Sequence, residues 1–278
     1  MLSRKDLAKE YYNIGNAFYE LGKTEEAVEY YRRAIELDRT LLKANYNLAR
    51  AYIEQKEYDQ GIAILDILLK KDPENTMILE TLGYACFKKG DFVLAREYYE
   101  KVLEVNELDE SSLYNLGLLS QAEGKEAEAL DYYLRLYKVN PEGNVLKKLG
   151  EIYASSGDNE KAIAYYEEYL TKNASDIDAN LAVKDLYMNE AYYSKALERL
   201  DNLTAQVKES DKLAEFYFEK GRLLIIFIGD YQKGIEALNA AIDNGFRDKQ
   251  KIGEFLKEVK GDLAQTLKDL FKKRGVYP

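Results

Sequence analysis

The sequence predicts an all-α solenoid, in which about seven helix-turn-helix repeats stack in order and further helices close the C-terminal end. A Tyr-Asn-aliphatic-small tetrapeptide begins at Tyr12, Tyr46 and Tyr114, at spacings of 34 and then 68 residues. A fixed period of this length is typical of helical repeat proteins. Within each period the apolar residues follow helical spacing. Only 3 of the 278 residues are proline, so helices can run through almost the whole chain.

The first helix of each repeat carries a small residue near its middle. This column is broken by Lys184, and its other members are Gly15, Ala49, Gly83, Gly117, Gly150 and Gly221. A second small column, in the second helix of each repeat, consists of Ala27, Gly61, Ala95, Ala129, Ala162, Ala196 and, after a one-residue insertion, Gly234. A bulky column follows it, with Tyr31, Leu65, Tyr99, Tyr133, Tyr166, Leu200 and Leu238. Small residues let two helices approach closely, and we expect the bulky residue to fill the space between repeats.

A turn separates the two helices of each repeat. Glycine suits the left-handed position that ends a helix, and the candidates are Gly22, Gly90, Gly124, Gly157 and Gly229. The predicted caps of the second helices are Thr24, Asp91, Asp158 and Asp230. Pro73 and Pro141 fall in linkers, where proline ends one helix and begins another. The solenoid is predicted at 1–246, with repeats at about 8–41, 42–75, 76–109, 110–142, 143–176, 177–210 and 214–246.

The segment 247–278 lies outside the repeat pattern. It contains two amphipathic stretches, Lys249–Val259 and Asp262–Lys272, which are separated by Gly261. The last repeat of a solenoid exposes an apolar face and needs a cap with a polar outer side. We therefore predict that these helices form a C-terminal cap and that they pack on the apolar run at 223–228.

Eight positions of the first repeat form a pattern that covers both helices, namely Tyr11, Ile14, Gly15, Phe18, Gly22, Ala27, Tyr31 and Ala34. This pattern resembles the tetratricopeptide repeat (TPR) family. The resemblance covers about residues 8–245 and is weakest in the last two repeats, where Lys184 and Lys220 replace a small and an aliphatic residue. It implies a right-handed solenoid that is not an enzyme and whose concave face holds an extended peptide or a helix of a partner protein.

The charge and composition exclude several classes of partner. The net charge of −10 argues against a nucleic-acid partner, because nucleic-acid binding needs a basic surface. No membrane insertion is expected, since the longest apolar run, Leu223–Ile228, is too short to cross a bilayer. The single cysteine, Cys86, cannot form an internal disulfide and favours a cytoplasmic location. A periplasmic location is the alternative, if a signal segment has been removed.

The sequence offers little for catalysis. There is no histidine, which removes the commonest general base and metal ligand. Cys86 lies at an inward-facing helical position with no histidine to activate it, so we expect a buried core thiol. No phosphate-binding or dinucleotide-binding motif is present. We therefore predict no catalytic residues, no metal site, no cofactor and no enzymatic activity.

Helical spacing places a set of polar and aromatic side chains opposite the packed face of the first helices. The predicted partner-binding groove, in repeats one to five, consists of Tyr12, Asn13, Asn16, Lys43, Tyr46, Asn47, Arg50, Tyr84, Tyr114, Asn115, Lys147 and Lys148. Equivalent positions hold Tyr19, Ile53, Glu54, Glu80 and Thr81. Side-chain amides can bond a peptide backbone, and tyrosines offer contact area at low entropic cost. We therefore expect a protein or peptide partner.

Cations in this set suggest that the partner carries carboxylates. Chaperone-docking members of the family that the chain resembles use a two-carboxylate clamp, of which Asn16 and Asn47 are present. Tyr12, Met77 and Thr81 stand where that clamp has cations, so the clamp is incomplete. A looser anionic site is predicted from Lys43, Arg50, Lys147 and Lys148.

A structural role is the alternative to a peptide-binding role. The chain would then be a self-associating scaffold or assembly subunit of a bacterial complex. Residues 223–228 and the C-terminal helices would form the homo-oligomer contacts. The two hypotheses differ in which surface, when mutated, abolishes association.

Overall fold

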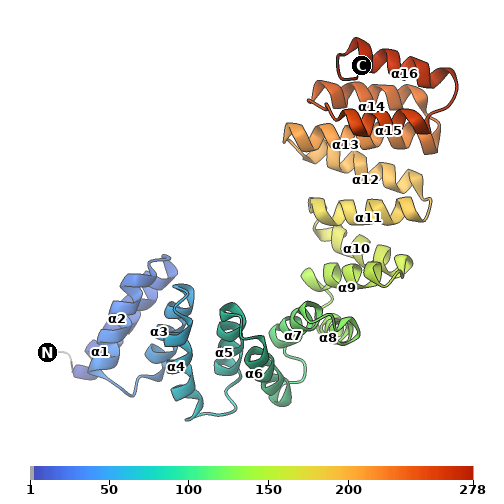
Figure 1. Cartoon of the computed structure of the whole chain (residues 1–278). Coiled ribbons are helices and arrows are strands. Elements are labelled where there is room, and N and C mark those ends of the chain that lie inside the picture. The colour runs from blue at the N-terminus through green and yellow to red at the C-terminus, as the bar shows by residue number, and fades with distance from the viewer. Residues whose placement is uncertain (1–2, 278) are drawn as a thin grey trace. The chain divides into compact units, whose positions relative to one another are not determined.

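Every regular element of the computed structural model is a helix within residues 3–277, which are the residues that the structure describes (Figure 1). The predicted all-α solenoid of paired helices is thus confirmed. Contacts divide the chain into two compact units, one ending at Pro141 and the other beginning at Glu142. This division falls inside the predicted 1–246 solenoid, and each unit is described by itself.

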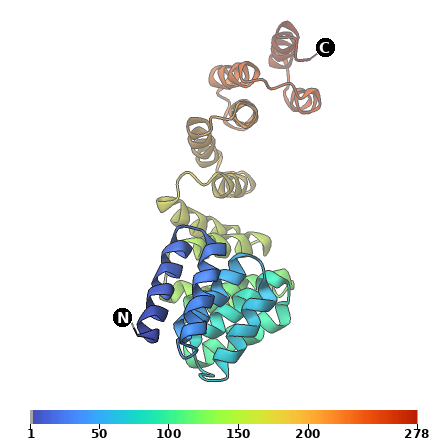
Figure 2. The same cartoon turned by 90° about the vertical axis from the view of Figure 1, so that its left-hand side faces the viewer.

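The N-terminal unit contains four helix pairs, coloured blue to green in Figure 2. Their bounds are α1 Arg4–Glu20, α2 Thr24–Leu37, α3 Leu42–Glu54, α4 Tyr58–Leu69, α5 Thr76–Lys89, α6 Phe92–Val105, α7 Glu110–Ala122 and α8 Glu126–Val139. Each helix packs on the one before it and the one after it. The first helix of each pair therefore contacts its own partner and the second helix of the preceding pair.

Glycines in the first small column pack directly against tyrosine rings. A Cβ atom added at Gly15 would lie 2.7 Å from the ring of Tyr31, and one added at Gly83 would lie 2.8 Å from the ring of Tyr99. Because real side chains do not approach this closely, only glycine lets the ring pack so near the helix backbone. These tyrosines are buried, as predicted for the bulky column.

The turns inside the helix pairs have the predicted left-handed residue. Gly22, Gly90 and Gly124 have φ angles of 72°, 90° and 72°. In the second repeat Lys56 occupies this position with φ of 65°, at the cost of steric strain. The prediction that Thr24 caps α2 is wrong. Thr24 is the first residue of the helix, Lys23 precedes it without a side-chain cap, and the Thr24 hydroxyl donates to Glu25 instead.

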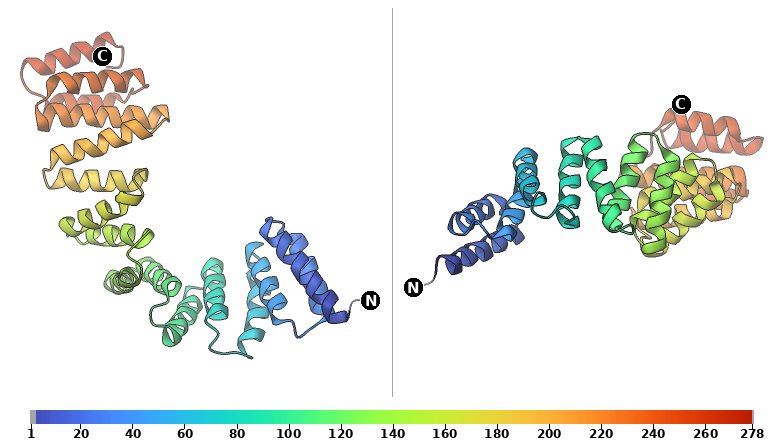
Figure 3. Two further views of the ribbon diagram at one scale, coloured as in Figure 1. Left: turned by 180° about the vertical axis from the view of Figure 1, so that it is seen from behind. Right: turned by 90° about the horizontal axis from the view of Figure 1, so that it is seen from below.

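The C-terminal unit contains three helix pairs and two further helices, coloured yellow-green to red in Figure 3. The bounds are α9 Asn144–Ser155, α10 Asn159–Lys172, α11 Ile177–Asn189, α12 Tyr193–Gln206, α13 Ser210–Leu223, α14 Tyr231–Asp243, α15 Lys249–Glu258 and α16 Asp262–Lys273. Asp158 and Asp230 cap α10 and α14 as predicted, and Asp91 does the same for α6.

A π-helical turn at Leu224–Ile228 extends α13. The sequence has one extra residue between the small columns of this repeat, at Gly221 and Gly234. A π turn takes up such an insertion while the helix continues. Consistent with this, a Cβ atom at Gly234 would lie 2.4 Å from Ile225, so the two helices still pack closely beyond the insertion.

Helices α15 and α16 cover the end of the last helix pair. Phe218 of α13 stacks on Phe246 at 4.1 Å between ring centroids, and Phe255 and Phe271 continue this aromatic core. Of the apolar run, Leu223, Leu224 and Ile225 are buried, and Ile225 belongs to the same core. Phe227 and Ile228 are 38% exposed each. The expected packing on 223–228 therefore holds for only part of that run.

Lys184 is buried although it stands in a column of small residues. Its ammonium reaches Asp185 at 2.9 Å and Glu219 at 2.6 Å. Burial disfavours the charged form, but these two carboxylates outweigh it and raise the pKa of Lys184. The long side chain fits because its repeat has Leu200, rather than a tyrosine, in the bulky column.

Candidate functional site

The predicted groove residues lie on the first helices of their repeats, and two of them belong to the C-terminal unit. Lys147 and Lys148 lie on α9, whereas the other ten lie on α1, α3, α5 and α7 of the N-terminal unit. The ten residues therefore belong to one unit and form one surface. It is called the inner surface below, and it is formed by α1, α3, α5 and α7.

Several of these side chains bond one repeat to the next. The Asn47 side-chain nitrogen donates to Asn16 Oδ1 at 2.8 Å, and it also donates to the Tyr12 hydroxyl at 3.4 Å. The hydroxyl of Tyr31 donates to the same Asn16 oxygen at 2.9 Å. Asn16 and Asn47 thus hold α1, α2 and α3 together. Both side chains therefore have a structural role, because their hydrogen bonds join neighbouring helices.

Tyr46 plays a similar part between the second and third repeats. Its hydroxyl lies 2.9 Å from the Thr81 hydroxyl, which donates to the Met77 carbonyl at 2.7 Å. Asn115 donates to the Ser111 carbonyl of its own helix at 2.8 Å. The ring of Tyr114 lies 6.0 Å from that of Tyr133.

Four predicted residues are open to a partner. Asn13, Lys43 and Arg50 are exposed, and Tyr84 is 43% exposed. The Arg50 guanidinium lies over the ring of Tyr19, 5.2 Å from its centroid. Because this contact leaves the guanidinium at the surface, Arg50 can still donate hydrogen bonds to a partner.

The inner surface contains a pocket of about 280 Å³. It is lined by Tyr19, Arg50, Ile53, Glu54, Glu80, Thr81, Tyr84, Tyr99, Ser111 and Asn115. This volume lies just below the range of small-molecule pockets, which is roughly 300–1,000 Å³, and it suits one side chain. Tyr99 was predicted for the bulky column, and neither Tyr99 nor Ser111 is among the predicted groove residues. Tyr99 lies on the second helix of its repeat, and it reaches this pocket across Gly83.

Two groups of the pocket, the Glu80 carboxylate and the Tyr99 hydroxyl, lack a hydrogen-bond partner within the described part of the chain, whereas Glu54 is hydrogen-bonded to the Tyr19 hydroxyl. Burial and, to a smaller extent, the Asp109 carboxylate raise the pKa of Glu80. No lysine or arginine nitrogen lies within 4.0 Å of Glu54 or Glu80 among residues 3–277. The hydroxyl of Tyr99 is buried without a hydrogen-bond partner. The pocket thus presents two carboxylates and a hydroxyl against one guanidinium, Arg50.

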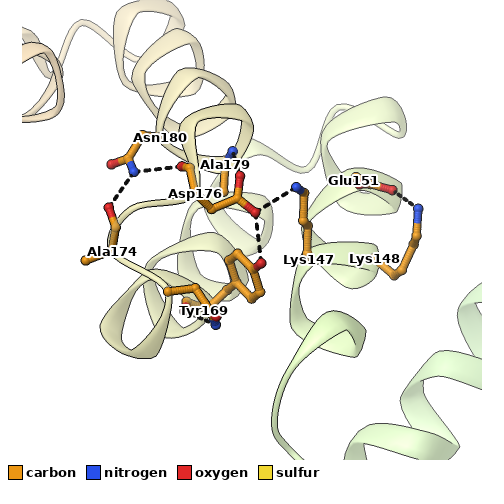
Figure 4. Close-up of polar contacts among 9 residues, drawn as sticks. Lys147, Lys148, Glu151, Tyr169, Ala174, Asp176, Ala179 and Asn180 are labelled. Carbon is orange, nitrogen blue, oxygen red and sulfur yellow. Dashed lines mark hydrogen bonds and ion pairs between the residues drawn. The ribbon is translucent and has the colours of Figure 1, made fainter. Parts of the chain in front are cut away.

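Lys147 and Lys148 in the C-terminal unit already have partners (Figure 4). Lys147 donates to Asp176 at 2.9 Å, and Lys148 donates to Glu151 at 2.6 Å. Asp176 also caps α11 through the Ala179 amide at 3.0 Å and accepts from the Tyr169 hydroxyl at 2.8 Å. A carboxylate of a partner would have to break these pairs.

Burial and hydrogen bonding oppose each other at Asp176. Burial disfavours ionisation, but the bonds from Lys147, the Ala179 amide and Tyr169 outweigh it and lower the pKa of Asp176. Burial also disfavours a charged Lys147, and here again the Asp176 carboxylate prevails and raises the lysine pKa. Both members of the pair are therefore ionised at neutral pH.

A larger pocket, of about 450 Å³, lies in the C-terminal unit among α11, α13 and α15. Its charged groups other than Glu254 pair with one another: besides Lys184, Arg222 pairs with Glu258 at 2.8 Å and Lys251 with Glu215 at 2.6 Å. Groups that are already held in ion pairs offer a ligand little unmet hydrogen-bonding capacity. The pocket of the inner surface is therefore the stronger candidate for binding.

Cys86 is buried, as predicted, and burial raises the pKa of its thiol to about 11. Such a thiol is a poor nucleophile near neutral pH. Within residues 3–277, no group of three or more His, Cys, Asp and Glu side chains is arranged to hold a metal ion. No helix in the described part of the chain has the length and apolarity needed to cross a bilayer.

Sequence comparisons agree on one family. Models of the tetratricopeptide repeat match residues 8–41, 46–112 and 114–177, together more than half of the chain. TPR repeat-containing protein MJ1428 of Methanocaldococcus jannaschii is 29% identical over 82% of this chain and 42% of that protein. Protein O-mannosyl-transferase TMTC3 of Homo sapiens is 27% identical over 80% of this chain and 25% of that protein. The chain thus spans less than half the length of either relative.

Solved structures agree on the fold. The structure of pilF from Pseudomonas aeruginosa superposes with a TM-score of 0.65 at 20% sequence identity. The match covers 79% of this chain and 100% of that one. At this identity the similarity concerns the fold alone.

Proposed function

Because the chain belongs to the tetratricopeptide repeat family, we propose that it is a non-enzymatic module that binds an extended segment or a helix of a partner protein. TPR proteins in general mediate protein–protein interactions. The binding surface would be the inner surface, formed by the first four repeats. Lys147 and Lys148 are left out of it because both are paired with carboxylates of the C-terminal unit.

One observation carries this proposal: the inner surface has a pocket of side-chain size that is lined by an exposed tyrosine and an exposed arginine. Tyr84 and Arg50 stand beside the pocket and are open to solvent. Tyrosine and arginine are enriched among the residues that dominate protein-binding energies. The match to the human transferase covers a quarter of that protein, so its printed activity is not carried over to this chain.

Self-association is the second candidate, and exposed apolar residues in the C-terminal unit favour it. Phe227 and Ile228 follow the buried half of the apolar run, and the ring of Phe227 lies 4.7 Å from that of Tyr193. Leu223, Leu224 and Ile225 are buried, so they cannot contact a second copy of the chain unless the C-terminal unit unfolds. The apolar residues of α15 and α16 are likewise used within the unit. The contact would therefore be limited to the exposed end of this run.

The two candidates are separated by affinity capture with matched variants. Tyr46 and Asn47 are poor choices for mutation because they bond neighbouring repeats. Arg50→Ala combined with Tyr84→Ala removes exposed inner-surface groups. Val93→Ala with Glu104→Ala is the matched control on α6, where both side chains are exposed.

We expect a partner protein that the wild type and the α6 control retain and the Arg50/Tyr84 variant loses. Circular dichroism checks that each variant is folded. Loss of association in a Phe227→Ser/Ile228→Ser variant, with the Arg50/Tyr84 variant unaffected, would instead establish self-association or assembly through the C-terminal unit.

A further inference from the structure

The charges that line the inner-surface pocket do not balance. Glu54 and Glu80 face a single cation, Arg50. Arg50 stands over Tyr19, on the α1 side of the pocket, whereas Glu80 lies on α5 beside Tyr84. Asp109, at the start of α7, adds a further negative charge near Glu80. In the C-terminal pocket carboxylates also outnumber cations, but all of them except Glu254 pair with Lys184, Arg222 or Lys251.

The unpartnered hydroxyl of Tyr99 is an independent sign of a missing ligand. Tyr99 is only 1% exposed and lines the same pocket. The equivalent tyrosines of the first and fourth repeats are satisfied, because Tyr31 donates to Asn16 and Tyr133 donates to Gln121. In the third repeat the corresponding positions hold aromatic residues, Tyr84 and Phe87, rather than amides. Buried hydroxyls nearly always have a partner in folded proteins, so this one is an exception that calls for a reason.

We propose that this pocket receives an arginine or lysine side chain of the partner segment, with Glu80 and the Tyr99 hydroxyl oxygen as its hydrogen-bond acceptors. This inference rests on the proposed function and specifies the chemistry of the partner. Guanidinium and ammonium groups carry only donors, which matches the unmet acceptors in the pocket. Charge-assisted bonds of this kind are the stronger class of hydrogen bond.

The aromatic walls support a cation in the same place. Tyr19, Tyr84 and Tyr99 line the pocket, and a cation near a ring face is attracted to it. The ring of Tyr84 already has the Lys88 ammonium 5.4 Å from its centroid. A carboxylate in the pocket would meet Glu54, Glu80 and the nearby Asp109, against Arg50 in the lining and Lys88 at the Tyr84 ring. The predicted anionic ligand therefore does not suit this pocket, although Arg50 can still bind a carbonyl or carboxylate beside it.

Short peptide libraries test the proposal on the full chain. One central position is fixed as arginine, lysine, citrulline or glutamate, and the flanking positions are randomised. Citrulline has the shape of arginine without its charge. We expect the arginine and lysine libraries to bind about tenfold more tightly than the citrulline library, as measured by fluorescence anisotropy. The glutamate library should bind least.

Three variants test which residues produce the preference for a cationic side chain. Glu80→Gln should remove the preference for arginine over citrulline, whereas Glu104→Gln, a change to an exposed carboxylate on α6, should keep it. Tyr99→Phe should weaken arginine binding without lowering the urea midpoint, because the hydroxyl has no partner to lose. A glutamate library that binds as tightly as the arginine library would overturn the proposal. So would a preference for arginine that survives in Glu80→Gln.

Failure of this inference can be told apart from failure of the proposed function. If Arg50 and Tyr84 are needed for capture of a partner but the libraries show no preference for a cation, only the cation pocket is wrong. If the Arg50/Tyr84 variant retains every partner and no library binds, both ideas fail.

Discussion

The ring of Tyr133 lies directly on the backbone of Gly117: a Cβ atom added at Gly117 would stand 2.4 Å from ring atom Cε1. The same relationship links Gly150 and Tyr166, at 2.9 Å. In the second repeat, where alanine replaces the glycine, the bulky residue is Leu65 rather than tyrosine. In the first five repeats tyrosine thus accompanies glycine and leucine accompanies alanine, whereas in the last repeat leucine accompanies glycine, and a Cβ atom added at Gly221 would lie 2.7 Å from Leu238.

Gly117→Ala should destabilise the N-terminal unit by about 1–3 kcal/mol, because the added methyl group forces the Tyr133 ring out of its site. Urea denaturation followed by circular dichroism measures this. Tyr133→Leu should cost less when it is combined with Gly117→Ala than when it is made in the wild type, since an alanine and a leucine already share these places in the second repeat. Effects of the two changes that add to within about 0.5 kcal/mol would contradict the steric explanation.

Lys56→Gly should stabilise the protein by about 0.5–1 kcal/mol. Lys56 has φ of 65°, a conformation that costs a side-chain-bearing residue energy and that glycine adopts freely. The matched opposite change is Gly90→Ala, at the same place in the next repeat. Gly90 has φ of 90°, and no atom lies within 4 Å of the added Cβ. It should destabilise the protein through strain alone. Equal urea midpoints for Lys56→Gly and the wild type would show that no strain is stored there.

Asp176→Asn should lower stability by about 1–2 kcal/mol at pH 7, because asparagine keeps a cap acceptor but loses the ion pair with Lys147. The native pKa of Asp176 is lowered, so its contribution is complete above the unfolded pKa of about 4 and is lost as pH falls through the native pKa. Urea midpoints of the two proteins should therefore converge under strongly acidic conditions.

Asp158→Asn is the control for this prediction. Asp158 is also a helix cap, of α10, but its only ion pair is with the exposed Lys161 of the same turn. The stability lost in Asp158→Asn should be smaller than that lost in Asp176→Asn at neutral pH. A loss equal to that of Asp176→Asn would show that capping, and not the contact with Lys147 and Tyr169, explains the effect.

Cys86 should resist thiol reagents in the folded protein. Burial raises its pKa to about 11, so at pH 8 the thiolate is about 100-fold rarer than in an unfolded chain with a pKa near 9. Reaction with a disulfide reagent should thus be at least that much slower without urea than in concentrated urea. Rapid labelling of the folded protein, at a rate independent of urea, would show that the thiol is exposed.

The sequence sufficed for the fold because the deciding contacts repeat. A glycine and a tyrosine at fixed places, such as Gly83 and Tyr99, specify a close helix pair wherever they recur. The insertion near Gly229 was visible in the sequence, but its accommodation by a π turn at Leu224–Ile228 was not. Periodicity shows which way a helix residue points, and it does not show how neighbouring helices absorb an extra residue.

The candidate site was predicted only in part, because spacing within one helix cannot show contacts between repeats. Asn16 and Asn47 were placed correctly on the first helices, yet they bond each other. Lys147 likewise pairs with Asp176, which is far along the sequence. Tyr99 was predicted to fill space between repeats, and whether its hydroxyl has a partner depends on side chains that other helices supply.

Site-specific photo-cross-linking tests the central claim most directly. A photoreactive phenylalanine derivative replaces Tyr84 on the inner surface in one protein and Val93, which is 73% exposed on α6, in another. We predict that a lysate of the source organism yields a cross-linked partner protein from position 84 and none from position 93. Cross-links from position 93 alone would contradict the claim that the inner surface of the first four repeats binds the partner.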